Sequence, residues 1–228
     1  MREVDRAAVD DYGVAILQMM EHAGRNLAIV ARATFFGGSA AGKNVLIAAG
    51  LGGNGGGGLS AGRQLHNMAA NVTVLLTAPV ENLVREAARQ LKTLQASGVQ
   101  IVQSGELDFG RQDLVVDAIF GYSLRGDPRG DAASVIDRIV ESGVPVLSND
   151  IPSGIEATSG RVGSPAIKAS STITIALPKK GLAEPAARAL VGDLYLGNIG
   201  VPPDLFPRCF PGMEMANPFE TSEIVRIW

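Results

Sequence analysis

Short apolar runs typical of β-strands alternate along this chain with segments whose apolar residues recur at helical spacing. This order predicts an α/β fold, in which right-handed βαβ units build a mainly parallel sheet covered by helices on both faces. Residues 9–34 predict one or two further helices, with a break at Gly13. The expected strands span residues 44–49, 71–77, 99–102, 113–121, 144–154, 171–178 and 192–200, and the expected helices span 59–69, 81–98 and 133–143.

Composition and charge narrow the classes of protein that this chain can belong to. With 46% hydrophobic and 19% charged residues, its 228 residues can bury a large core. No repeat or linker divides it, so we expect one domain over residues 1–228, with an irregular tail from Pro202 on the surface. A net charge of −3 argues against a general nucleic-acid surface, and no apolar run approaches the length of a membrane span. Cys209 is the single cysteine, so no internal disulfide can form and cytoplasmic residence is expected.

The most unusual stretch is AAGLGGNGGGGLSAGRQL, which follows the first expected strand and leads into a helix-like segment. A glycine-rich loop before a helix can offer free N–H groups and the positive end of the helix dipole to a phosphate or pyrophosphate. It is not a P-loop, because no Gly-Lys-Ser/Thr follows. It is also no clean dinucleotide fingerprint, because residues 71–77 end without an acidic residue to hold a ribose. A plain flexible turn is the alternative interpretation.

Oxygen-bearing side chains stand where several expected strands end, which is where ligands sit in parallel α/β sheets. They are Asn54 in the glycine stretch, Asp117 after the run LVV, and Asp150 and Ser153 in NDIPSG. An oxygen set with few negative charges suits a hard, weakly charged cation better than zinc, which prefers histidine or cysteine. Taken singly, Asp117 could instead cap a helix and Ser153 could be an ordinary turn residue.

Taken together, these segments resemble the YjeF N-terminal domain family, whose enzymatic members are NAD(P)H-hydrate epimerases. The resemblance covers roughly residues 5–205 and rests on blocks in the family's order: DRAAVDDYGVAILQMMEHAGRNLA, VLIAAGLGGNGGGGLSAGRQL, VVDAIFGYSLRGDPRG, VLSNDIPSGIEATSGRVGSPAIKASSTITIALPKKGL and GDLYLGNIGVPPDL. It implies a Rossmann-like three-layer α/β/α sandwich with a mainly parallel central sheet. The family is often dimeric through its N-terminal helices, which makes a homodimer possible.

The resemblance implies that the substrate is a hydrated nicotinamide cofactor, NADHX or NADPHX, whose R and S forms the epimerase interconverts. It implies a separate ADP- or ATP-dependent dehydratase as the functional partner, because that enzyme repairs the S form. It places a potassium ion on Asn54, Asp117 and Ser153. It gives substrate contacts to two runs and one strand end: Gly53, Asn54, Gly55, Gly56 and Gly57; Gly121, Tyr122, Ser123, Leu124, Arg125, Gly126 and Asp127; and Asp150.

Asp150 is the expected catalytic acid/base, because inversion at the hydroxylated carbon needs a proton for the leaving hydroxide and a carboxylate near the resulting cation. The alternative is a turn carboxylate that holds DIPSG by accepting backbone hydrogen bonds.

The glycine stretch is also where the chain departs from the family pattern, since Gly53 replaces an asparagine and Gly57 an aspartate. The added glycines predict a looser loop and weaker binding. Two alternatives to an active epimerase therefore stay open. One is a catalytically impaired nucleotide-binding or scaffold module on the same fold, and the other is an enzyme that acts on a different nucleotide-like ligand.

Overall fold

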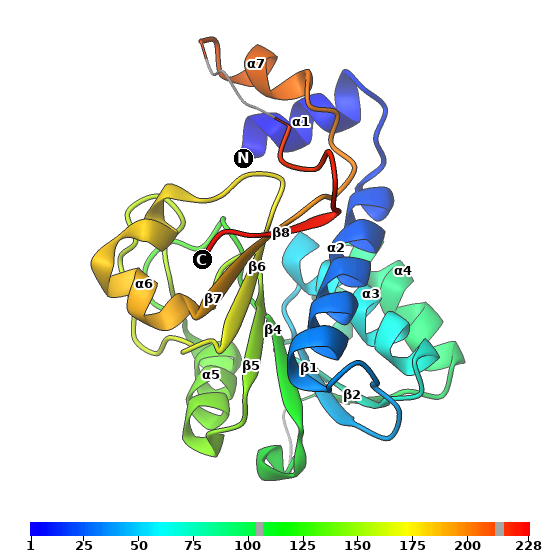
Figure 1. Cartoon of the computed structure of the whole chain (residues 1–228). Helices are drawn as coiled ribbons and strands as arrows, with labels where there is room; N and C mark the ends of the chain where they lie inside the picture. Colours follow the sequence, from blue (N-terminus) through cyan, green and yellow to red (C-terminus); the bar gives the residue numbers. More distant parts are fainter. Residues whose placement is uncertain (104–106, 213–216) are drawn as a thin grey trace.

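The structure is a computed structural model that describes residues 1–103, 107–212 and 217–228, and one eight-stranded sheet runs through it (Figure 1). The strand order is β3-β2-β1-β4-β5-β6-β7-β8, and all neighbouring pairs are parallel except β7 and β8. The strands are β1 Asn44–Ala49, β2 Asn71–Leu76, β3 Gln100–Gln103, β4 Leu114–Ala118, β5 Val146–Asn149, β6 Ser171–Ile175, β7 Asp193–Gly197 and β8 Ile224–Arg226. The predicted α/β class with a mainly parallel sheet is confirmed.

Strand β1 shows why such a sheet forms. Residues 45–49 are all buried, as expected for a strand that is covered on both faces. Val45 and Ile47 join the core on one side of the sheet, whereas Leu46 and Ala48 join the core on the other. Because side chains alternate along a strand, one continuous apolar run serves both layers.

The helices form the outer layers of the predicted three-layer sandwich (Figure 1). Helices α2, α3 and α4 cover one face, and α5 and α6 lie on the other side of the sheet. Helices α1 and α7 pack together with the chain that follows β6 and β7, at the carboxyl ends of the strands. The helices are α1 Arg2–Asp10, α2 Ile16–Val30, α3 Gly53–Asn67, α4 Arg85–Ala96, α5 Gly130–Ser142, α6 Pro185–Val191 and α7 Leu205–Cys209. None of the helices in these described ranges is both long and apolar enough to cross a membrane.

Three features differ from the sequence predictions. Helix α3 begins at Gly53 rather than at residue 59, so most of the glycine stretch is helical. Helix α6 was not predicted, although Pro185 stands at its first turn and Gly192 (φ 64°) follows its last residue, both ordinary helix boundaries. The tail from Pro202 is not irregular throughout, because it supplies α7 and the antiparallel edge strand β8; residues 213–216 of this tail lie outside the described ranges. The predicted break at Gly13 is confirmed, since α1 ends before this residue and Gly13 has a φ of 69°.

Candidate active site

The strand order reverses between β1 and β4, and a cavity of about 870 Å³ opens beyond the carboxyl ends of these strands. Chain segments 50–54, 77–78, 119–123 and 149–150 line it from the sheet, and parts of α1 and α2 line it from the other side. Crevices at such a reversal are the usual ligand sites of open parallel sheets, because the chains on either side turn away in opposite directions. Of the polar residues expected at the strand ends, Asn54 and Asp150 line this cavity, whereas Asp117 and Ser153 lie outside its lining.

Close packing accounts for most of the glycines in α3. A Cβ on Gly55 would lie 1.8 Å from the Gly50 carbonyl oxygen, and one on Gly58 would lie 2.4 Å from Ala118 Cβ. A Cβ on Gly50 would likewise meet the Ile119 carbonyl oxygen at 2.0 Å. These glycines let the helix lie almost on the backbone of the sheet, so the expectation of a loose loop is wrong.

Only the start of α3 faces the cavity. Gly53 and Asn54 line it, and nothing lies within 4 Å of a Cβ built on Gly53. Gly55, Gly56 and Gly57 are buried inside the packed helix, away from the cavity lining. The helix has a glycine, Gly52, at its N-cap and no capping side chain, so its first N–H groups and its positive dipole end open toward the cavity. This end of α3 can bind an anionic group.

Asp117 is a fully buried carboxylate at the end of β4. It accepts hydrogen bonds from Ser153 Oγ at 2.6 Å, from the Ser153 backbone N–H at 2.8 Å and from Ser148 Oγ at 2.9 Å. Among the described residues no basic group forms an ion pair with it, and burial raises the pKa of Asp117 despite these hydrogen bonds. A buried carboxylate without a positive partner suits a site that also holds a cation.

Asn54 adds polar atoms to the same region. Its Oδ1 lies beside Gly121, 3.1 Å from the place of a Cβ there, and its buried Nδ2 has no hydrogen-bond partner in the described chain. Asn149, which sequence reasoning did not select, also lines the cavity, and its buried Oδ1 is equally unpartnered. Unsatisfied buried polar atoms are rare in proteins, so a bound ligand would account for both. No three His, Cys, Asp or Glu side chains of the described ranges cluster as a metal site.

Asp150 follows β5 and is 2% exposed. Its φ of 68° is left-handed, a conformation that non-glycine residues adopt mainly where the surrounding contacts impose it. Its Oδ1 forms an ion pair with Lys179 Nζ, and its Oδ2 accepts a hydrogen bond of 3.2 Å from the Tyr122 N–H. Lys179 is itself buried and donates to the Ile175 carbonyl oxygen at 2.7 Å. This buried pair brings a charged, compensated carboxylate to the cavity wall.

Sequence reasoning missed Lys179, the first of two consecutive lysines in the segment ALPKKGL. It also missed Asp5, which lies on α1 and lines the cavity. Tyr122 Oη donates a hydrogen bond of 2.6 Å to Asp5 Oδ2. Burial is the main reason that the pKa of Asp5 is raised, and burial together with the hydrogen bond to Asp5 raises the pKa of Tyr122.

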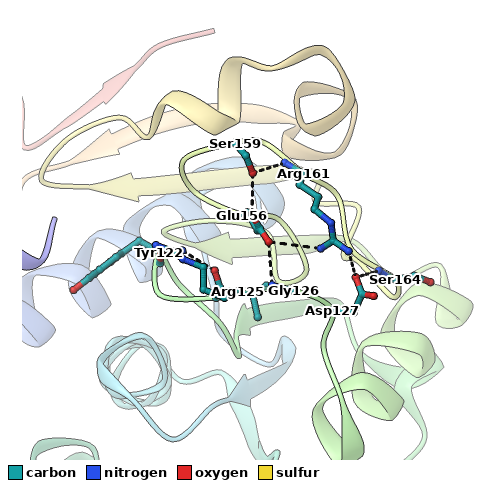
Figure 2. Close-up of polar contacts among 9 residues, drawn as sticks. Tyr122, Arg125, Gly126, Asp127, Glu156, Ser159, Arg161 and Ser164 are labelled. Atoms are coloured by element: carbon teal, nitrogen blue, oxygen red, sulfur yellow. Dashed lines mark hydrogen bonds and ion pairs between the residues drawn. The ribbon is translucent and has the colours of Figure 1, made fainter.

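The segment from Gly121 to Asp127 divides into two halves. Gly121, Tyr122 and Ser123 line the cavity, whereas residues 124–127 do not. Figure 2 shows how the second half is held instead: Arg161 Nη2 pairs with Asp127 at 2.7 Å, and the Gly126 N–H donates to Glu156 Oε1 at 3.0 Å. Arg125 Nη1 donates a hydrogen bond of 2.8 Å to the Leu124 carbonyl oxygen, and the Leu124 side chain is buried. These residues anchor the segment to the loop formed by residues 156–164.

Comparisons with known proteins agree with this architecture. The family model described as YjeF-related protein N-terminus matches residues 16–181. A protein of Dehalogenimonas lykanthroporepellens named NAD(P)H-hydrate epimerase is 40% identical over 230 residues, which cover 100% of this chain and 90% of that protein. The bifunctional NAD(P)H-hydrate repair enzyme Nnr of Moorella thermoacetica is 36% identical over 213 residues, which cover 90% of this chain and 40% of that protein.

A solved yeast structure, titled ynu0, YNL200c, has a TM-score of 0.82 at 24% identity and covers 99% of this chain and 96% of that one. At this level of identity it supports the fold alone. The family model spans well over half of the chain, and the match to the Dehalogenimonas relative extends over the whole of this chain. The chain belongs to the family of YjeF-related protein N-termini.

Proposed function

We propose that this protein is an isomerase, an NAD(P)H-hydrate epimerase that interconverts the R and S forms of NADHX and NADPHX. The observation that carries the proposal is the cavity at the strand reversal, which combines an open helix N-terminus with a buried, ion-paired carboxylate. Relatives of 40% and 32% identity that carry this name support it.

The two ends of the cavity suit the two ends of such a substrate. The pyrophosphate would bind at the start of α3, near Gly53 and Asn54, where no side chain of the described residues caps the helix and the dipole is positive. The hydroxylated nicotinamide ring would then lie against Asp150 and the segment that includes Gly121, Tyr122 and Ser123. The predicted contacts of Gly55, Gly56 and Gly57, and of Leu124, Arg125, Gly126 and Asp127, would be indirect, through the shape that these residues give to the walls.

Asp150 is the proposed acid/base group. Breaking the C–O bond sends its electron pair to oxygen, and the ring nitrogen lone pair stabilises the cation that is left. A carboxyl group beside that carbon can protonate the leaving oxygen or accept a proton from the returning water, and its anionic form favours the cation. Lys179 holds the Asp150 carboxylate in place through the ion pair.

Three oxygen-bearing side chains, from α3, from β4 and from the loop after β5, suit a potassium ion. Asn54, Asp117 and Ser153 would hold it, because they offer an amide, a carboxylate and a hydroxyl oxygen and because the buried Asp117 lacks a positive partner among the described residues. The bound ion would supply compensating positive charge next to the anionic part of the substrate. An enzyme that dehydrates the S epimer, an activity class suggested by the bifunctional repair relatives, would be the functional partner.

The direct test supplies R-NADHX to the purified protein together with an S-specific dehydratase and ATP, and follows the recovery of NADH absorbance. We expect recovery far above the spontaneous rate, with Asp150→Asn reducing it by about 10²–10⁴-fold. Asp137→Asn is the matched control, because Asp137 is exposed on α5 and outside the cavity lining. No acceleration by folded wild-type protein would refute the proposal and favour an impaired binding module.

A further inference from the structure

Tyr122 connects two carboxyl groups that line the same cavity. Its backbone N–H donates to Asp150 Oδ2 at 3.2 Å, and its phenol donates to Asp5 Oδ2 at 2.6 Å. Figure 2 shows the Tyr122 ring pointing away from the contacts that anchor Gly126 and Asp127. The two carboxyl groups are therefore separated by about the length of a tyrosine side chain, one on the sheet side of the cavity and the other on α1.

The surroundings of the two carboxyl groups differ. Asp150 is ion-paired with Lys179, which compensates for its buried negative charge. Asp5 is half-buried, and among the described residues no basic side chain lies within ion-pairing distance of it. Burial raises the pKa of Asp5 and the negative charge of Asp150 adds to this, while Tyr122, the N-terminal ammonium and Lys179 act in the opposite direction. Asp150 thus suits the anionic role and Asp5 the protonated one.

Inverting the hydroxylated carbon makes demands on both faces of the nicotinamide ring. The hydroxyl must leave from one face as water, and water must return to the other face. A carboxyl group on a single face can serve one of these steps, whereas a pair that flanks the carbon can serve both, as general acid–base catalysis on opposite faces of a sugar ring illustrates.

We infer that Asp5 is a second acid/base group of this enzyme, which serves the ring face opposite to the one served by Asp150, and that Tyr122 positions it. This inference rests on the proposed epimerase function. In one direction, Asp5 gives its proton to the hydroxyl oxygen, the C–O bond breaks with both electrons on oxygen, and water leaves. Water then attacks the cation from the other face and passes a proton to Asp150, so that the two carboxyl groups exchange protonation states.

The test compares epimerisation with the exchange of the substrate hydroxyl for ¹⁸O from labelled water, measured by mass spectrometry on each epimer separately. Asp5→Asn should lower the turnover number for epimerisation by about 10²–10⁴-fold. The Asp5→Asn variant should still catalyse ¹⁸O exchange with the substrate epimer whose hydroxyl faces Asp150. The Asp150→Asn variant should still catalyse exchange with the other epimer. Tyr122→Phe keeps both carboxyl groups and should lower the ratio of epimerisation to exchange, which keeps the inference testable if Asp5→Asn does not fold.

A second tyrosine–aspartate pair provides the matched control. Tyr12 Oη donates to the exposed Asp204 at 2.8 Å and links the end of α1 to the start of α7, outside the cavity lining. Tyr12→Phe and Asp204→Asn should therefore keep wild-type rates of epimerisation and exchange. If Asp5→Asn lost exchange equally with both substrate epimers, or kept it equally with both, the assignment of Asp5 would be overturned. The proposed epimerase function would still stand as long as the wild type is active. An inactive wild type would instead refute the proposed function, and the assignment with it.

Discussion

Adding one methyl group at Gly58 should destabilise the protein, although alanine is the better helix former. A Cβ on Gly58 would lie 2.4 Å from Ala118 Cβ and 3.5 Å from Ile47 Cγ2, whereas carbon atoms pack at about 3.5–4.0 Å. Ala118 has no side-chain torsion that could relieve the contact, so α3 or β4 must shift by about 1 Å. Overpacking of this kind costs about 1–3 kcal/mol, and the gain in helix propensity returns about 1 kcal/mol. We expect a net loss of about 1 kcal/mol, and at most about 2 kcal/mol, for Gly58→Ala.

Urea unfolding followed by circular dichroism measures this change as a shift of the midpoint at constant slope. Gly53→Ala is the control within the same helix, because nothing lies within 4 Å of a Cβ there. Its unfolding free energy should stay within about 0.5 kcal/mol of wild type. A Gly58→Ala variant as stable as wild type, or a Gly53→Ala variant that is equally destabilised, would refute packing as the reason for the glycines.

Three further predictions concern Lys179, the proposed ion site and Asp5. Lys179→Met should lower the unfolding free energy, measured by urea unfolding, by about 3–5 kcal/mol, because it leaves the buried Asp150 carboxylate unpaired. Adding Asp150→Asn should recover most of this loss. A double variant as unstable as Lys179→Met would contradict the prediction. Potassium chloride should raise the unfolding temperature more than sodium chloride does at equal ionic strength. Asp117→Asn should abolish this difference. If the wild type shows no difference between the two salts, the proposed ion site is wrong. Burial raises the pKa of Asp5, so its contribution to stability is full below the ordinary aspartate pKa and is lost as pH rises through the raised value. Relative to wild type, Asp5→Asn should therefore become more stable as the pH rises above the ordinary aspartate pKa, and a pH-independent difference in unfolding free energy would argue against it.

The fold was accessible from the sequence because its signals are local. Strands buried on both faces must be apolar throughout, so runs such as residues 44–49 stand out, and β1 has the predicted bounds. The start of α3 was not accessible in this way, because six glycines between residues 50 and 57 argue against a helix by propensity. The contacts that require them, such as that of Gly50 with Ile119, come from chain segments far apart in the sequence.

The site was accessible only in part, for a related reason. Residues that follow directly after strands must gather at one edge of a parallel sheet, and this rule predicted the cavity that Asn54 and Asp150 line and the contact between Asp117 and Ser153. Lys179 and Asp5 obey no such rule. Lys179 lies beyond β6 and reaches Asp150 across neighbouring strands, and Asp5 lies on a helix whose position over the cavity depends on tertiary packing. Neither position carries a local pattern that marks it as polar and buried.

The replacement of two family side chains by Gly53 and Gly57 was the reason to consider an impaired site, and the structure separates the two positions. Gly57 lies inside the packed helix, where a Cβ would be 2.9 Å from Asn149 Nδ2, and it does not line the cavity. Gly53 does line the cavity, so its lost side chain enlarges the space beside the helix N-terminus. The donors expected there for an anionic group are backbone N–H groups, which a glycine keeps. The glycine at position 53 therefore removes a side chain and keeps the backbone N–H groups that we propose as the anion-binding donors of α3.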